Sequence, residues 1–308
     1  MRKLLIVGVL AAVCAAVLAV QGGAAPTAAA GPAAAGVTKA TKLPPLPADV
    51  KSRKRWVIGV KCDFSPFGYI DVTGHNAGYD VEVARQFALL AFGKTNRVNF
   101  VCVTTPSRIP ALQTKRVDII VSTLTWTKAR TEVIDFSTPY YGATGRLAVT
   151  KTSSIQSVKD LAGKNVVTTR GALYSPWTKL CVSGANLSEV DSPGSAVLAV
   201  KNGQADTFMF DDAYLLGVVT QDRDMRLTKD KFLQIPWGIG IRKGDAETKA
   251  WVDAALQRLQ AKDFFYKVAL KKNTPKALLD DFAPNVPRPG KSLKYPEDRD
   301  AATDCTVT

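Results

Sequence analysis

The stretch WVIGVKCDFSPFGYIDVTGHNAGYDVEVARQFALLAFGKTNRVNFVCV, residues 56–103, sets the pattern of the fold. Its first five residues form a short apolar run that is typical of a buried strand. Residues 81–90 have the periodicity of an amphipathic helix, and Asp80 is its predicted N-cap. Residues 98–103 are a second apolar run. A strand, a helix and a strand in this order predict parallel strands joined by a crossover helix.

The same alternation continues outward from this stretch. The further predicted elements are a helix at 107–115, strands at 118–121 and 146–151, a short helix at 157–161, a strand at 165–169, helices at 174–181 and 193–201, a strand at 207–210, an extended segment at 239–242 and a helix at 247–260. This order predicts an α/β fold with doubly wound parallel sheets. From residue 273 onward the chain holds five of its 17 prolines and little pattern, which predicts an extended tail.

Length and composition are those of a globular protein of about two domains, with 308 residues, 46% of them hydrophobic and 22% charged. Lys and Arg number 41 against 27 Asp and Glu, a net charge of +14. Basic residues are spread along the chain without interleaved aromatic residues, so we expect solubility rather than nucleic-acid binding from this charge. The single histidine, His75, argues against a histidine metal centre or a catalytic triad. We expect no metal, cofactor or catalytic residue.

The N-terminus has the layout of a secretory signal peptide: two cations, an apolar run and then small residues. We expect residues 1–30 to be this signal, with cleavage after Ala30, and residues 31–52 to be a flexible spacer. Cys14 offers lipoprotein anchoring as an alternative, although Val13 replaces the small residue usually found before a lipidated cysteine. Either route places the protein outside the cytoplasm, in the periplasm or at the cell surface.

Four cysteines follow the signal segment: Cys62, Cys102, Cys181 and Cys305. In an exported chain they predict two disulfides, for which three pairings exist. Cys62 and Cys102 each lie at the end of a predicted strand, which favours a bond between them. Cys181 would then pair with Cys305 and hold the tail. The alternative is four free, buried thiols.

Short strings along the chain carry a family resemblance. They are Gly59-Val60 with Asp63, Pro66-Phe67-Gly68, Gly78-Tyr79-Asp80-Val81, RIPALQ (108–113), VDII (117–120), STLTWTKAR (122–130) and DFSTPYY (135–141). In this order they closely resemble the extracytoplasmic solute-binding proteins of polar amino-acid ABC transporters, which are type 2 periplasmic binding proteins of family 3. The resemblance covers residues 54–272.

This resemblance implies two doubly wound α/β lobes joined by a two-segment hinge, with the ligand in the cleft between them. Lobe 1 would comprise residues 53–141 and 240–308, lobe 2 residues 146–235, and the hinge residues 141–146 and 236–239. The implied function is capture of a polar amino acid by a monomer and its delivery to an ABC permease. Open parallel sheets bind ligands at the carboxyl ends of their strands, which agrees with this placement.

The resemblance also implies which residues hold the ligand's α-carboxylate. A buried carboxylate or ammonium needs a fixed partner, because leaving either unpaired costs several kcal/mol. Arg130 matches the arginine that ends the family motif, and its planar fork can bind two carboxylate oxygens. The alternative is a surface arginine on a short helix. The hydroxyl residues that flank it in the motif are Ser122, Thr123 and Thr125.

Asp211, at the end of a predicted strand, is the implied partner of the ligand's ammonium group. The neighbouring Asp212 is the alternative for this role, or else a helix cap. Lobe 2 would add backbone N–H groups at Gly171 and Ala172, which stand before a helix. Many family members have Gly-Thr-Thr at this place, so two hydroxyls are missing here.

Two aromatic residues and further cations complete the expected site. Phe64 and Phe67 would contact the ligand, unless they only close the core. Arg108, with Thr105 nearby, resembles the version of the motif found in binders of acidic amino acids, and Arg170 would add another cation. These arginines favour glutamate or aspartate, although the same arginine occurs in relatives with other ligands. The alternative for Arg108 is a surface residue of a helix's first turn.

Two other classes of function remain open from sequence. An enzyme on the same scaffold, such as a dehydratase, would need catalytic groups, but no paired carboxylates stand out and His75 lies in a loop rich in Gly and Asn. A sensor domain would need a membrane span and a cytoplasmic output segment, and the sequence has a pattern for neither. A free-standing protein that signals through a membrane receptor is the remaining form of this alternative.

Overall fold

The computed structural model describes residues 42–296 and 298–307, which belong to a compact unit spanning Ala40–Thr308. The expected signal peptide, its cleavage site and Cys14 lie outside the described residues. Within the described ranges, no helix has the length and apolar character needed to cross a bilayer.

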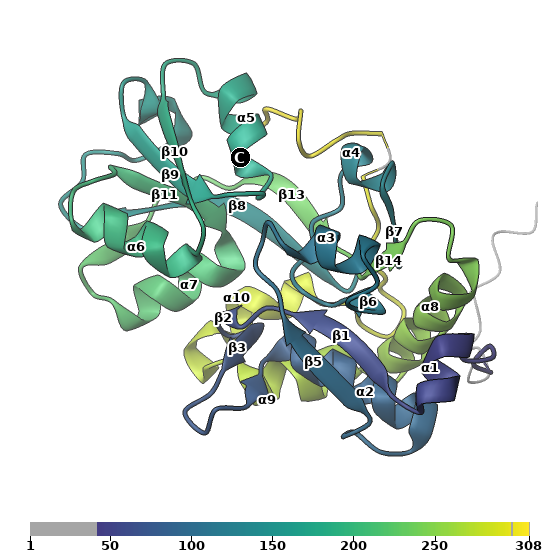
Figure 1. Cartoon of the computed structure of the whole chain (residues 1–308). Helices are drawn as coiled ribbons and strands as arrows, with labels where there is room; N and C mark the ends of the chain where they lie inside the picture. The colour runs from purple at the N-terminus through teal and green to yellow at the C-terminus, as the bar shows by residue number, and fades with distance from the viewer. Residues whose placement is uncertain (1–41, 297, 308) are drawn as a thin grey trace, which may run out of the picture. The chain divides into compact units, whose positions relative to one another are not determined.

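The first sheet contains five strands in the order β5-β1-β6-β14-β7 (Figure 1). β5, β1 and β6 are parallel, whereas β14 is antiparallel to both β6 and β7. The strands are β1 (Trp56–Val60), β5 (Val98–Cys102), β6 (Ile119–Ile120), β7 (Ile134–Phe136) and β14 (Gly240–Arg242). The parallel strands confirm the predicted fold class. Because their carboxyl ends lie at one edge, the residues that follow β1, β5 and β6 come together there.

Helices pack on this sheet through large aromatic side chains. The ring of Trp251 lies 5.1 Å from that of Trp56 and 5.5 Å from that of Phe87, so α8 and α2 share one core with β1. The helices are α1 (Ala48–Arg53), α2 (Tyr79–Phe92), α3 (Arg108–Gln113), α4 (Lys128–Thr131), α8 (Ala246–Ala261), a π-helix (Phe265–Leu270), α9 (Lys271–Asn273), α10 (Leu279–Phe282) and 3₁₀ turns at Lys276–Leu278 and Ala283–Asn285.

Three expectations for this lobe were wrong in detail. Residues 48–52, expected in the spacer, belong to α1, because Val50 buries its side chain in the core. Residues 276–285 are helical rather than extended, and Leu278 and Phe282 are buried. The N-cap of α2 is Gly78, and Asp80 instead accepts a hydrogen bond from the backbone N–H of Thr123.

A second, six-stranded sheet has the order β10-β9-β11-β8-β12, with β13 also paired to β8. Its strands are β8 (Tyr141–Thr150), β9 (Asn165–Thr169), β10 (Asn186–Val190), β11 (Thr207–Asp211), β12 (Met225–Leu227) and β13 (Phe232–Trp237), and its helices are α5 (Tyr174–Cys181), α6 (Pro193–Lys201), α7 (Asp212–Gln221) and a 3₁₀ turn at Val158–Leu161. We call the first sheet with its helices lobe 1 and this sheet with its helices lobe 2. A small antiparallel sheet in lobe 1 has strands β2 (Asp63–Phe64), β3 (Gly68–Ile70) and β4 (Asn76–Ala77).

The antiparallel strands β8 and β13 carry the chain between the two sheets. Tyr141 pairs with Trp237 at one end of this ladder, and Gly145 with Phe232 at the other. Both segments expected to form the hinge lie in or beside these strands. β8 begins five residues earlier than the strand expected at 146, because its first half pairs with β13. That these segments bend remains a prediction.

Both disulfides join the expected cysteines: Cys62 with Cys102, and Cys181 with Cys305. The first links Cys62, two residues after β1, to Cys102 at the end of β5. The second links the end of α5 to the tail, and the sequence separation that it closes is 124 residues. The bond between Cys62 and Cys102 joins residues at strand ends, as the sequence suggested, and the remaining two cysteines form the second bond.

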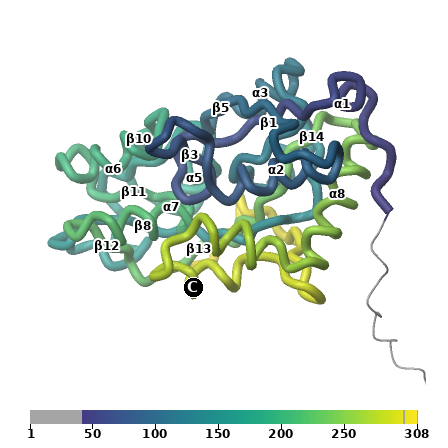
Figure 2. The backbone as a smooth tube through the Cα atoms, turned by 90° about the horizontal axis from the view of Figure 1, so that it is seen from below, coloured from purple at the N-terminus to yellow at the C-terminus, as the bar shows by residue number. Residues whose placement is uncertain are grey.

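The tail crosses from lobe 1 to lobe 2, so the assignment of residues up to 308 to lobe 1 was wrong. In lobe 1 the Tyr295 hydroxyl donates to the Ser137 carbonyl at 2.6 Å, and its ring stacks on Trp126. In lobe 2 the indole N–H of Trp177 donates to the Asp304 carbonyl at 2.8 Å. Val307 forms a β-bridge with Phe232, and Figures 1 and 2 both show the chain ending beside β13.

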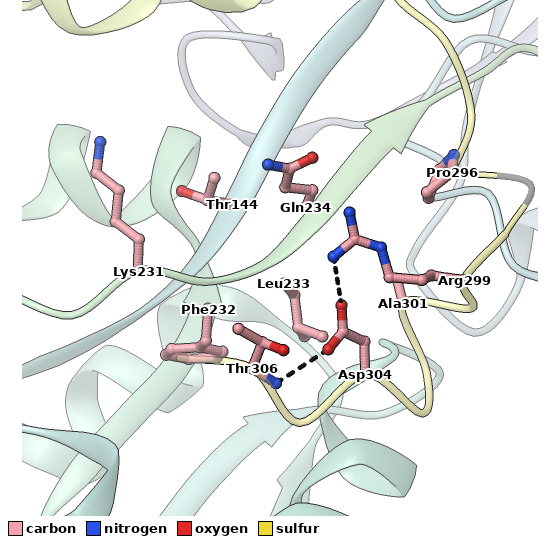
Figure 3. A pocket seen from close by; sticks show the side chains of 10 residues that line it. All are labelled: Thr144, Lys231, Phe232, Leu233, Gln234, Pro296, Arg299, Ala301, Asp304 and Thr306. Carbon is pink, nitrogen blue, oxygen red and sulfur yellow. Dashed lines mark hydrogen bonds and ion pairs between the residues drawn. The ribbon is translucent and has the colours of Figure 1, made fainter. Parts of the chain in front are cut away.

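A cavity of about 210 Å³ lies between the tail and β13 (Figure 3). Within it, Asp304 accepts hydrogen bonds from the side chain of Arg299 and the backbone N–H of Thr306. These bonds fold the tail onto itself, so the charges of Arg299 and Asp304 largely satisfy one another.

Candidate functional site

The candidate site is a small cavity between the two lobes. Its walls are Thr105, Arg108, Thr123 and Thr125 from lobe 1, and Ala172, Leu173, Tyr174, Phe210 and Asp211 from lobe 2. The cavity offers about 10 Å³ of space, which is room for about one water molecule. An amino acid therefore enters only when the walls move apart, and the lobes are close together here.

Arg130 connects the two lobes beside this cavity. It lies in α4, where the Thr127 side chain caps the helix by accepting the Arg130 backbone N–H. Its Nη1 donates to the Thr125 carbonyl at 2.7 Å, and its Nη2 donates to the Gly171 carbonyl of lobe 2 at 2.9 Å. Desolvation lowers the pKa of Arg130 to about 10, and the Coulomb attraction of Asp211 opposes this shift. Arg130 therefore stays charged at neutral pH.

Arg108 is buried, with 4% of its surface exposed, and only part of its guanidinium is satisfied. Its Nη1 donates to the carbonyls of Ser122 at 2.7 Å and Thr123 at 3.0 Å, while Nε is buried without a partner. Desolvation, and then the charge of Arg130, lower the pKa of Arg108 to about 9. A buried donor without an acceptor costs free energy, so this side of Arg108 suits a ligand oxygen.

The loop that follows β6 is held from two sides. The Thr123 backbone N–H donates to Oδ2 of Asp80 at 2.9 Å and to the Tyr140 hydroxyl at 3.2 Å, while Arg108 holds the carbonyls. Thr123 has a φ of 47°, a conformation that a β-branched residue rarely adopts without support. Burial raises the pKa of Asp80 to about 7. The predicted residue Ser122 is fully buried behind this loop, and its hydroxyl has no partner.

Asp211 lies at the end of β11, and its carboxylate faces the cavity. Tyr174 of α5 donates its hydroxyl to Oδ1 of Asp211 at 2.6 Å. Desolvation raises the pKa of Asp211 to about 7, against the opposing effects of the Tyr174 hydrogen bond and the two arginines. Asp212 has a different task, because its carboxylate accepts hydrogen bonds from the backbone N–H and hydroxyl of Thr144 on β8.

The structure separates Arg170 from the cavity. Its side chain is 57% exposed and pairs with Asp191 at 2.9 Å. Nor does Ala172 offer a free donor, because its backbone N–H donates to the Thr169 carbonyl at 3.0 Å. Gly171 has a φ of 74° and lies against Pro106 of lobe 1, where a Cβ would stand 3.1 Å from the Cα of Pro106. The missing side chain of Gly171 therefore lets the two lobes approach closely. Its carbonyl, and not its N–H group, contacts a charged group, the guanidinium of Arg130.

The two predicted aromatic residues lie in the core next to the cavity and do not line it. Phe67 is fully buried, with its ring 4.7 Å from that of Tyr141 and 5.0 Å from that of Trp237. Phe64 packs on Phe210, which is itself a wall of the cavity, at 5.7 Å. Their contribution to the site is therefore support of the wall from behind.

Sequence reasoning missed Lys61, which lies directly behind Thr105. Lys61 is fully buried, and its Nζ donates to the Thr105 hydroxyl at 3.1 Å and pairs with Asp63 at 2.9 Å. Desolvation lowers its pKa, and Asp63 opposes this shift. The sequence did contain a signal for Lys61. It directly follows a predicted apolar strand, and the carboxyl ends of parallel strands are where ligands bind. Tyr174 was missed as well.

The comparisons with known proteins agree on one family. Residues 56–271 match the family model described as bacterial extracellular solute-binding proteins, family 3. The ABC transporter glutamine-binding protein of Bacillus subtilis is 32% identical over 231 residues, which are 73% of this chain and 85% of that protein. The L-glutamate/L-aspartate-binding protein of Pseudomonas aeruginosa is 29% identical over 245 residues, covering 75% of this chain and 78% of that protein.

Solved structures are similar over the same part of the chain. The crystal structure of a cysteine-binding protein from Campylobacter jejuni has a TM-score of 0.71 and 30% sequence identity, and the match covers 76% of this chain and 96% of that one. The three proteins are named for different amino acids: glutamine, glutamate or aspartate, and cysteine. Similarity therefore indicates that the ligand is an amino acid but does not identify which one. The described tail beyond residue 271 lies outside the family model.

Proposed function

Because this chain belongs to family 3 of the bacterial extracellular solute-binding proteins, we propose that it captures glutamate or aspartate between its lobes and delivers it to an ABC permease. It is an amino-acid-binding protein of an ABC transporter and not an enzyme, like the relatives described above. We further propose that it acts as a monomer outside the cytoplasm, reached through the signal peptide expected in residues 1–30.

The concentration of buried cations carries the proposal of an acidic ligand. Arg108 forms part of the cavity wall, Lys61 lies behind Thr105, and Arg130 spans the lobes beside it. Burying a cation without an anionic partner is costly, so this group of residues favours a ligand that brings two carboxylates.

Asp211 supports the amino-acid part of the proposal. It is the carboxylate among the residues that line the cavity, so it can accept an ammonium group, and the charges of Arg108 and Arg130 act on it. We assign the α-carboxylate to Arg130 and the side-chain carboxylate to Arg108 with Thr105. A ligand between the lobes is contacted by both of them only when they close, so the ligand selects the closed arrangement.

Glutamine is the second candidate, and the ion pair of Lys61 with Asp63 favours it. That pair neutralises one of the cations, which lowers the need for a second ligand carboxylate. The similarity to the glutamine-binding protein of B. subtilis supports the same alternative.

Calorimetric titration of the mature protein with glutamate, aspartate, glutamine, arginine and histidine tests the proposal. We expect the two acidic amino acids to bind most tightly. Arg108→Ala should weaken glutamate by about 10- to 100-fold and glutamine by much less, since only glutamate loses a charged contact. An equal loss for every ligand would refute the role assigned to Arg108, and no binding of any amino acid would refute the proposed function.

A further inference from the structure

Tyr174 is buried at the start of α5, with only 1% of its surface exposed. Its ring lies between Phe210 and Phe232, with centroid distances of 5.8 and 6.3 Å. This packing fixes the ring, so the hydroxyl is held 2.6 Å from Oδ1 of Asp211. Within the described residues, the Asp211 carboxylate accepts one hydrogen bond, and Tyr174 donates it.

The other groups that act on Asp211 differ in which lobe they belong to. Arg108, Arg130 and Lys61 stabilise its charge, and all three belong to lobe 1. Asp212 belongs to lobe 2, and Tyr141 belongs to β8, which connects the lobes. Neither residue offers Asp211 a positive charge, and the charge of Asp212 destabilises the ionised form of Asp211.

When the lobes part to admit a ligand, the three cations leave with lobe 1. Tyr174 stays with Asp211, because both belong to lobe 2. As the lobes close on a ligand and exclude water, a carboxylate without any donor would take up a proton, and a protonated carboxylate binds an ammonium group poorly.

We propose that Tyr174 is a positioning residue for ligand binding: its hydroxyl keeps Asp211 ionised and directs the free Oδ2 toward the ligand's ammonium group as the lobes close on the ligand. This inference rests on the proposed function, because it assumes an amino-acid ligand. It adds a residue whose contact with the ligand is indirect and whose effect depends on pH.

The sign of the pH effect follows from the charge that binding requires. With the lobes close together, as in this structure, burial raises the pKa of Asp211 to about 7, and a bound ammonium group would lower it. Binding then releases a proton at low pH, so affinity increases as pH rises toward 7 and levels off above it. Without the Tyr174 hydroxyl the pKa of Asp211 rises further, and the plateau moves to higher pH.

The test is calorimetric titration of glutamate from pH 5.5 to 8.5 with the wild-type protein and Tyr174→Phe. We expect the variant to lose about tenfold more affinity at pH 6 than at pH 8.5 for each unit by which the pKa rises. Tyr295→Phe is the matched control, because it removes a partly buried hydroxyl with an equally short 2.6 Å bond away from the cavity. This control should leave the pH profile unchanged. Asp80 also titrates near pH 7, but it does so equally in the wild type and in both variants, so it does not affect the comparison.

Equal loss of affinity at every pH in Tyr174→Phe would overturn the positioning role while leaving the proposed function intact. Asp211→Asn provides a second variant if Tyr174→Phe does not fold. It should remove the part of the pH dependence that belongs to Asp211, and a wild-type profile in that variant would also overturn the inference. Failure of the wild-type protein to bind glutamate, aspartate or glutamine at any pH would instead reject the proposed function.

Discussion

At the scale of single residues, three arginines that the sequence placed in one cleft have three different surroundings. Arg130 bridges the lobes, Arg108 is buried with an unsatisfied Nε, and Arg170 is an exposed partner of Asp191. Charge alone does not distinguish them in sequence, because burial and partners arise only after the strands and helices are packed. We therefore expect replacement of each arginine to reduce the affinity for the ligand by a different amount.

Arg130→Ala should reduce the affinity for every amino acid by at least about 100-fold, since both the ligand contact and the link to Gly171 are lost. Arg170→Ala is the matched control and should bind normally, because an exposed ion pair contributes little. Titration calorimetry of both variants measures this. Similar losses in the two variants would contradict the different placement of the two side chains.

Asp80 predicts a pH dependence of stability in the ligand-free protein. Its pKa is raised to about 7, whereas an aspartate in an unfolded chain has a pKa of about 3.9. Between pH 4 and pH 7 the folded protein keeps this carboxyl protonated, whereas the unfolded chain has lost the proton. The contribution of Asp80 to the free energy of unfolding is therefore largest below pH 4. The contribution is then lost as pH rises toward 7.

Asp80→Asn should therefore reduce the loss of stability between pH 5 and pH 8 by about 2 kcal/mol. The asparagine oxygen can still accept the Thr123 N–H, so the loop keeps its hydrogen bond. Urea unfolding at the two pH values gives the difference. An unchanged pH dependence in the variant would show that Asp80 is ionised in the folded protein throughout this range.

At the scale of elements, several strands and helices were predictable, whereas the edge strand β10, the helices α1 and α7 and the strand β13 were not. Residues 165–169, 174–181 and 193–201 form the strand and two helices expected, because apolar periodicity or a capping serine marks them. β10 was missed because its residues are largely exposed at a sheet edge and lack an apolar run. α1 was missed because it has only one buried anchor, Val50.

The turn between β9 and α5 predicts a separate effect on closure. Gly171→Ala would force a left-handed residue to carry a Cβ that stands 3.1 Å from the Cα of Pro106 in the opposite lobe. We expect this contact to oppose closure and to weaken ligand binding about tenfold. Titration with glutamate measures the loss.

Gly203→Ala is the control for Gly171→Ala. Gly203 also has a left-handed φ, of 71°, but a Cβ there meets no atom within 4 Å. This variant should lose about 1 kcal/mol of stability and keep its affinity. If both variants bind like the wild type, the approach of Gly171 to Pro106 does not contribute to ligand capture.

At the scale of the whole molecule, the tail is a third connection between the lobes, beside the two strands β8 and β13. The sequence indicated its disulfide but not its course, because nothing in a proline-rich segment reports that Tyr295 packs on one lobe and Asp304 on the other. The lobe assignment failed there for this reason. The strand order predicted parallel strands in both sheets, but it did not predict the antiparallel strands that each sheet also contains.

The disulfide that anchors this tail predicts a loss of stability when it is removed. Replacing Cys181 and Cys305 together with alanine should lower the free energy of unfolding by about 2–4 kcal/mol, because the bond closes a long loop. Denaturant unfolding of this double variant against the wild type measures the change. Equal stability would mean that the tail's other contacts suffice to hold it.

The central claim is that Arg130 and Asp211 hold the two ends of one amino-acid ligand between the lobes. A crystal structure of the protein grown with L-glutamate tests it most directly. We expect the ligand in the cavity, with its α-carboxylate within hydrogen-bonding distance of Arg130, its ammonium group on Asp211 and its side-chain carboxylate near Arg108. Glutamate bound elsewhere, or bound in the cavity with neither end on these two residues, would contradict the account.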